Sequence, residues 1–145
     1  MTEYFSAAQP VDAPVDRVWN ILADLGNREF VKGFCRAVHV TGSGFGAVRT
    51  FALLDEAGGG SVSERIEPFD PESRCYGYRV FDIGPLPFAD YVGSFRIAAA
   101  GPKRCVVIYH ATFLPVGDAP VSLGQEMVRR NFDFVVMRLR EMSSK

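Results

Sequence analysis

The stretch TGSGFGAVRTF, residues 41–51, decides between two folds. Gly42, Gly44 and Ala47 fit a loose dinucleotide-binding fingerprint, in which closely spaced glycines let a pyrophosphate approach the N-terminus of a helix. That fingerprint needs a strand before it and a helix after it, whereas AVRTFALL (residues 47–54) continues as another strand. We therefore interpret the glycines as the connection of an antiparallel hairpin and not as a nucleotide-binding loop.

Strand-like runs extend from this hairpin toward both ends of the chain. Runs bounded by turn-forming residues occupy residues 4–11, 36–40, 46–54, 61–69, 74–82, 91–99 and 105–114. Short segments rich in glycine and proline, such as DEAGGG and GPLPFAD, separate consecutive runs. Strands joined by such short connections pair in the antiparallel sense. The pattern therefore predicts a meander of about seven strands.

Helical periodicity flanks the strand region. Apolar residues recur at helical spacing within residues 12–26, and NREFVKGF (residues 27–34) is compatible with a short second helix. A longer helix is expected from near Ser122, which forms a capping-box pattern with Gln125, to about Met142. Its apolar stripe comprises Val128, Phe132, Val135, Leu139 and Met142. Only the sheet can bury that stripe, so we expect a single α+β domain over residues 1–145, with a curved antiparallel sheet wrapped around a long C-terminal helix.

Composition narrows the classes of partner. The 145 residues carry a formal net charge of −1, so no overall basic field favours nucleic acid. Three widely spaced cysteines and two histidines form neither a disulfide framework nor a metal-ligand set. No run approaches the ~20 apolar residues of a membrane span, and the N-terminal residues lack the pattern of a targeting signal. We expect a soluble cytoplasmic protein, monomeric or homodimeric, that needs no metal or cofactor.

Two charged residues fall on otherwise apolar strand faces. Strand alternation places Arg49 and Glu64 among apolar neighbours on the same faces of their strands. A hairpin centred between Glu56 and Ala57 puts Arg49 directly opposite Glu64. Such an interior pair is costly unless the two side chains satisfy each other or meet a polar group of a ligand. Two interpretations stay open: a buried ion pair that only fixes strand register, or a polar anchor for a ligand.

Five stretches together resemble one known superfamily. They are APVDRVWNILADLGN (13–27), GSGFGAVRT (42–50), SERIEPFDPESRCYGYRV (63–80), PLPFADYVGSFRI (85–97) and YHATFLP (109–115). They cover nearly the whole chain and resemble the START and birch-pollen-allergen superfamily, also called SRPBCC or helix-grip. Within it they resemble the polyketide cyclase/dehydrase and lipid-transport group, which includes relatives of the plant abscisic-acid receptors. The resemblance implies two short helices after the first strand and a hydrophobic cavity between the sheet and the C-terminal helix.

The residues expected to line that cavity come from inward-facing strand positions and from the long helix. Tyrosines are favoured among them, because a buried hydroxyl needs a partner and a ligand can supply one. The candidate ligand-binding residues are Arg49, Phe51, Glu64, Tyr76, Tyr78, Tyr91, Phe95, Tyr109, Ala111, Asn131 and Val135. His39 and His110 are expected to face outward, and the sequence assigns no catalytic residue.

Three functions fit these expectations. The leading one is the binding of a small hydrophobic molecule, aromatic, polyketide-like or lipid, in the cavity. The alternative is an enzyme of the cyclase or dehydratase type, which would polarise a folded substrate with Arg49, Glu64 and a tyrosine. The third is an interaction protein that uses its loops or a sheet edge. Hormone recognition is disfavoured, because the chain lacks the SGLPA and HRL motifs of the abscisic-acid receptors and has Gly33 or Phe34 near their carboxylate-binding lysine.

Overall fold

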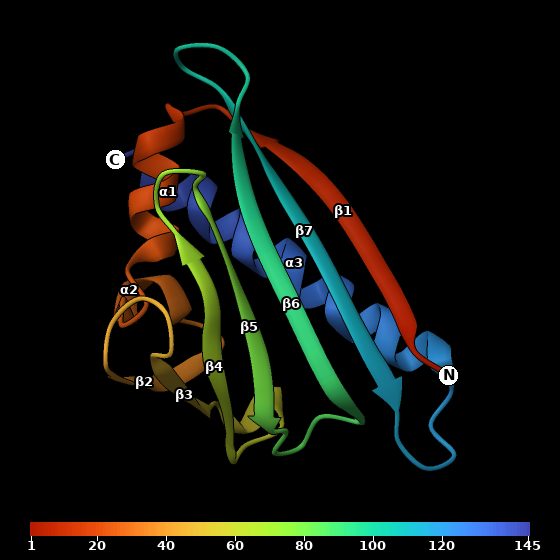
Figure 1. The fold of residues 1–145 in the computed structure, drawn as a ribbon. Coiled ribbons are helices and arrows are strands. Elements are labelled where there is room, and N and C mark those ends of the chain that lie inside the picture. The colour runs from red at the N-terminus through yellow and green to blue at the C-terminus, as the bar shows by residue number, and fades with distance from the viewer.

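The fold is a seven-stranded antiparallel sheet with three helices, seen in a computed structural model that describes residues 1–145 (Figure 1). The strands are β1 (Glu3–Val11), β2 (Cys35–Thr41), β3 (Val48–Leu53), β4 (Ser61–Asp70), β5 (Cys75–Asp82), β6 (Phe88–Ala99) and β7 (Cys105–Pro115). The helices are α1 (Val15–Ala23), α2 (Arg28–Val31) and α3 (Val121–Ser143), and a short 3-10 turn covers Asp55–Ala57. The predicted α+β helix-grip fold is confirmed.

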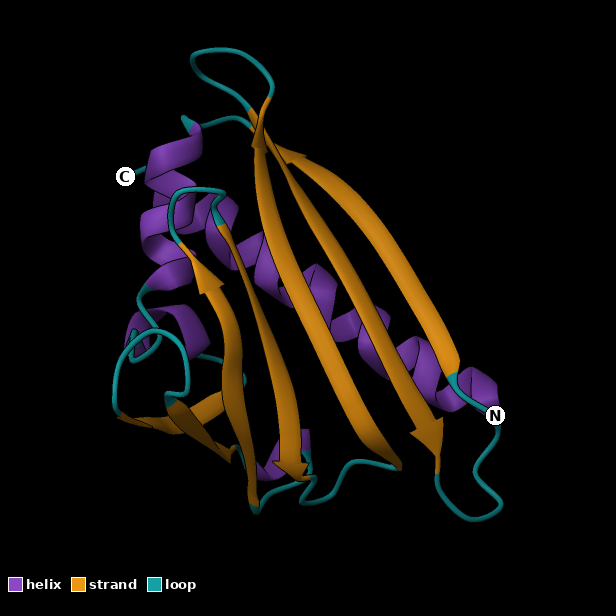
Figure 2. Ribbon diagram, in the orientation of Figure 1, coloured by secondary structure: helices purple, strands orange, loops and turns teal.

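The strand order follows from the short connections. Strands β2 to β7 form a meander, and β1 joins its far edge beside β7, which gives the order β1-β7-β6-β5-β4-β3-β2 (Figure 2). The glycine-rich stretch forms the turn between β2 and β3, as predicted. Gly42, Gly44 and Gly46 there adopt positive φ angles of 84°, 60° and 84°, which side chains other than glycine rarely tolerate.

Helix α3 runs diagonally across one face of the sheet (Figure 1). Four of the five residues of its predicted apolar stripe are buried: Val128, Phe132, Val135 and Leu139. The ring of Phe132 stacks on Tyr109 of β7, with centroids 5.5 Å apart. The helix therefore packs directly on the β1–β7 side of the sheet. None of the helices is long and apolar enough to cross a membrane.

The start of α3 differs from the predicted capping box. The helix begins at Val121 after Pro120, so Ser122 already lies within the first turn and caps nothing. Gln125 instead donates from Nε2 to the carbonyl oxygen of Tyr4 at 2.9 Å. Proline fixes the φ angle at the entry to a helix and has no N–H to satisfy. That backbone constraint moves the start of the helix ahead of the serine on which the capping-box pattern rests.

Candidate ligand-binding site

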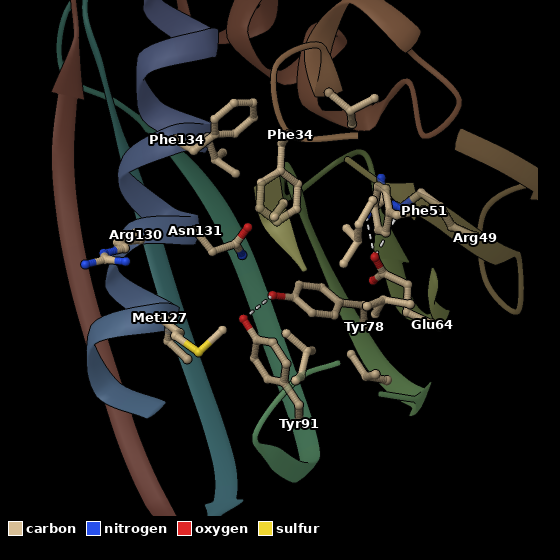
Figure 3. Close-up of a pocket in the computed structure, with 18 of the residues that line it drawn as sticks. Phe34, Arg49, Phe51, Glu64, Tyr78, Tyr91, Met127, Arg130, Asn131 and Phe134 are labelled. Atoms are coloured by element: carbon tan, nitrogen blue, oxygen red, sulfur yellow. Dashed lines mark hydrogen bonds and ion pairs between the residues drawn. The ribbon is translucent and has the colours of Figure 1, made fainter. Parts of the chain in front are cut away.

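A cavity of about 620 Å³ lies between the sheet and the three helices. It is lined by 28 residues, of which 20 are hydrophobic, so its wall suits an organic molecule more than an ion. The wall is formed by α1, α2, β3 to β6, the loops after β3 and β5, and one side of α3. Figure 3 shows side chains from the strands and from α3 converging on this space.

The cavity lies on the side of the sheet from which α3 diverges. Of the eleven candidate residues, those in the lining are Arg49, Phe51, Glu64, Tyr76, Tyr78, Tyr91, Phe95, Asn131 and Val135. Tyr109 and Ala111 lie on β7, are almost fully buried, and do not line the cavity. Alternation correctly gave the face on which these two residues lie, but α3 covers that part of the face directly.

Arg49 and Glu64 form the buried ion pair expected from the hairpin register. They are cross-strand partners on β3 and β4. Arg49 donates to Oε1 of Glu64 from Nε at 3.3 Å and from Nη2 at 3.2 Å. Its remaining bonds go to the hydroxyl of Tyr76 at 3.3 Å and to the carbonyl of Leu25 at 3.4 Å. The guanidinium also lies 4.8 Å from the centroid of the Phe51 ring, within the range of a cation–π contact.

The ion pair is buried, and burial shifts the pKa values of the groups around it. Burial lowers the pKa of Arg49, but Glu64 and Tyr76 outweigh that effect and raise it above its ordinary value. Burial raises the pKa of Glu64, and Arg49 offsets only part of the increase. Burial likewise raises the pKa of the nearby Cys35 thiol to about 12, against the opposing effect of Arg49. One atom is left without a partner: the buried oxygen Oε2 of Glu64 accepts no hydrogen bond.

A second polar cluster consists of three tyrosine hydroxyls. Tyr78 donates to Tyr91 at 3.1 Å, and Tyr109 lies 2.5 Å from each of the two, oxygen to oxygen. Each hydroxyl can donate once and accept once around this ring, so the three satisfy one another. Burial raises the pKa of all three phenols, furthest for Tyr78 and Tyr109. These hydroxyls therefore do not depend on a ligand for a partner.

Several cavity residues were not predicted. They are contributed by α1 and the α2 region, by the two loops and by α3: Leu22, Leu25, Asn27, Phe30, Val31, Phe34, Glu56, Ala57, Gly58, Pro85, Leu86, Met127, Arg130 and Phe134. The apolar residues of NREFVKGF were a usable signal for the contribution of the α2 region. Met127, Arg130, Asn131 and Phe134 recur at i, i+3, i+4 and i+7, so they share one face of α3 beside the buried stripe.

The two histidines and Lys32 lie outside the site. His39 is exposed, and exposed His110 lies 2.8 Å from the Ser6 hydroxyl oxygen through its Nδ1. Lys32 is exposed at the end of α2 and does not line the cavity. No three His, Cys, Asp or Glu side chains gather in an arrangement that could hold a metal ion.

Comparison with known proteins agrees with this architecture. The fold and its cavity place the chain in the SRPBCC class of helix-grip proteins. Residues 3–142 match the family described as polyketide cyclase/dehydrase and lipid transport, and the chain belongs to that family.

Solved structures of several helix-grip proteins superimpose well on this one. The Zhui aromatase/cyclase from Streptomyces sp. R1128 does so with a TM-score of 0.83 at 18% identity, covering 99% of this chain and 94% of the other. Norcoclaurine synthase from Thalictrum flavum, in a complex with dopamine and hydroxybenzaldehyde, gives 0.80 at 14% identity, covering 98% and 86%. Ara h 8.0201 gives 0.82 at 15% identity, covering all of both chains. At these identities the likeness establishes the fold alone.

Proposed function

We propose that this protein binds a small hydrophobic molecule, aromatic, polyketide-like or lipid, in the cavity between the sheet and α3. The observation that carries the proposal is a mostly apolar space of about 620 Å³ with a buried polar cluster in its wall. Pockets for drug-sized ligands have this size and this combination of an apolar lining with a few placed polar groups. Membership of a family that includes lipid transport supports the same function.

A second candidate is catalysis of a cyclase or dehydratase type in the same cavity. Its support is the structural likeness to an aromatase/cyclase and the presence of Arg49, Glu64 and Tyr76 in the cavity wall. These groups could orient a reactive substrate and stabilise developing charge. If Arg49→Ala and Glu64→Gln leave the turnover of an identified substrate unchanged, this assignment of roles is wrong.

Native mass spectrometry tests the binding proposal. Protein purified without added ligand should carry a bound small molecule, or should bind members of a panel of aromatic and lipid compounds. Val135→Trp should abolish this binding, because Val135 lines the cavity and indole would fill it. Met137→Trp is the matched control, since Met137 is exposed on α3 outside the cavity. The proposal fails if neither the purified protein nor the panel gives a complex, or if both variants bind equally well.

A further inference from the structure

The inner part of the cavity wall contains one buried polar atom that the protein leaves unsatisfied. It is Oε2 of Glu64, whereas Oε1 of the same carboxylate accepts two hydrogen bonds from Arg49. Leaving a buried acceptor without a donor is unfavourable, and more so for a charged group. Oε2 is itself buried, but Glu64 is one of the cavity-lining residues, so a slight turn of its carboxylate group about the soft terminal torsion lets a donor on a bound molecule reach it.

No protein donor bonds to Oε2 in this structure. Arg49 directs its guanidinium to Oε1, to Tyr76 and to a backbone carbonyl, and the Tyr76 hydroxyl accepts from Arg49. Tyr78 and Tyr91 line the cavity, but their hydroxyl hydrogens are engaged in the ring with Tyr109. The unsatisfied acceptor oxygen of Glu64 is therefore available for a hydrogen bond from a ligand.

The charges of the cavity wall argue against an anionic ligand. The two lining cations each have a carboxylate partner: Arg49 pairs with Glu64, and Arg130 pairs with Glu126 at the surface of α3. The remaining charged lining residue is Glu56, on the exposed loop after β3. Arg49 is always protonated, so the buried pair is neutral only while Glu64 is ionised. A ligand carboxylate near it would add an uncompensated negative charge in a buried environment.

We propose that the bound molecule is uncharged and carries a hydroxyl or N–H group that donates to Oε2 of Glu64. Its apolar part occupies the space between the aromatic residues of the sheet and α3, with Phe51, Phe95 and Phe134 among its neighbours. This inference rests on the proposed function, and it narrows the ligand class to neutral hydrophobic alcohols, phenols or amides.

Three probes of similar shape test the inference on the wild-type protein. Calorimetric titration at neutral pH compares 2-naphthol, 2-fluoronaphthalene and 2-naphthoate. A hydrogen bond to a charged acceptor should favour 2-naphthol over its fluoro analogue by ~10- to 100-fold, and 2-naphthoate should bind most weakly. If the first two bind equally, or if 2-naphthoate binds best, this inference is overturned while the proposed function stands. If none of the three binds, this inference is overturned, and native mass spectrometry decides separately whether the proposed function stands.

The side-chain carboxyl resonance of Glu64 locates the contact. Binding of 2-naphthol should shift its ¹³C signal, and 2-fluoronaphthalene should shift it much less; equal shifts would contradict a direct hydrogen bond. Glu64→Gln should remove the preference for 2-naphthol and strengthen 2-naphthoate binding roughly tenfold, because Arg49 then lacks a counter-charge. Glu67→Gln is the control, since Glu67 lies on the same strand, pairs with Arg79 at the surface and does not line the cavity. If Glu64→Gln does not fold, the wild-type ranking and the carboxyl shift decide.

Discussion

The two polar clusters of the cavity wall differ in how completely their hydrogen bonds are satisfied. In the tyrosine ring, the hydroxyl groups of Tyr78, Tyr91 and Tyr109 form hydrogen bonds with one another and need no other partner. In the ion-pair cluster, Arg49 has several partners while one oxygen of Glu64 has none. A complete buried network stiffens a fold, whereas an incomplete one has capacity left for another molecule. We therefore propose that the tyrosine ring holds the shape of the cavity wall, and that the ion-pair cluster contacts the ligand.

The largest effect is expected from truncating one partner of the ion pair. Glu64→Ala leaves Arg49 buried without a counter-charge, and should lower the free energy of unfolding by about 3–5 kcal/mol. Urea denaturation with an unchanged m value measures this loss. Asp16→Ala is the matched control, because it breaks the exposed Asp16–Arg74 pair and should cost less than about 1 kcal/mol. Equal losses in the two variants would show that Arg49 is as well solvated as a surface residue.

The ion-pair geometry was accessible from the sequence because it depends on local rules. Strand alternation fixed the faces of Arg49 and Glu64, and the turn fixed which residues stand opposite each other. The observed distance of 3.2 Å between Nη2 and Oε1 confirms both steps. By contrast, the unpaired state of Oε2 depends on the positions of several side chains around the carboxylate. Residue spacing carries no information about that.

The tyrosine ring was not predicted, because it joins three strands. Alternation correctly put Tyr78, Tyr91 and Tyr109 on the inner face, but the meeting of their hydroxyls depends on sheet curvature and strand stagger. The direction in which α3 crosses the sheet could not be predicted from the sequence either. Its stripe predicts a buried face, but the angle at which it crosses the sheet decides that Tyr109 is covered while Asn131 lines the cavity.

Alkaline pH should destabilise the protein through the tyrosine ring. Burial raises the folded-state pKa of Tyr78, Tyr91 and Tyr109, so the unfolded chain loses these protons first. The stability that these phenols contribute is therefore present below their ordinary pKa of about 10 and is lost as pH rises toward the folded-state values. Denaturation at about pH 9 and about pH 11 measures the loss, and Tyr109→Phe should reduce it. If these tyrosines ionise in the folded protein at or below about pH 10, as absorbance of tyrosinate would show, burial does not raise their pKa values.

A smaller loss of stability is expected when an added methyl group pushes against the tyrosine ring. Gly93 pairs with Tyr78 across β5 and β6, and a Cβ at Gly93 would lie 2.7 Å from Cε1 of that tyrosine. Gly93→Ala should therefore displace the Tyr78 ring and cost about 1–3 kcal/mol in the free energy of unfolding. Gly26→Ala is the comparison, because the added Cβ there meets Val40 at an ordinary 3.7 Å. If Gly93→Ala is as stable as Gly26→Ala, the packing of the ring is looser than its hydrogen bonds indicate.

The smallest loss of stability is expected when one hydroxyl group is removed from each cluster in turn. Tyr109→Phe breaks two hydrogen bonds of the ring and leaves Tyr78 and Tyr91 with one bond between them. Tyr76→Phe breaks one bond from Arg49, which keeps Glu64 and the Leu25 carbonyl as acceptors. We expect a loss of about 1–2 kcal/mol for Tyr109→Phe and about 1 kcal/mol for Tyr76→Phe in urea denaturation.

The order of these two values carries the interpretation, because both side chains are almost fully buried and each substitution removes only an oxygen. Removing one hydroxyl from the fully satisfied tyrosine ring should lower the free energy of unfolding more than removing one from the ion-pair cluster, which already has an unsatisfied atom. Affinity for 2-naphthol provides an independent readout, and neither substitution removes Oε2 of Glu64, so both variants should still prefer it to 2-fluoronaphthalene. If Tyr76→Phe proves the more destabilising, Tyr76 is essential to holding Arg49, and the ion-pair cluster has a structural role as large as that of the ring.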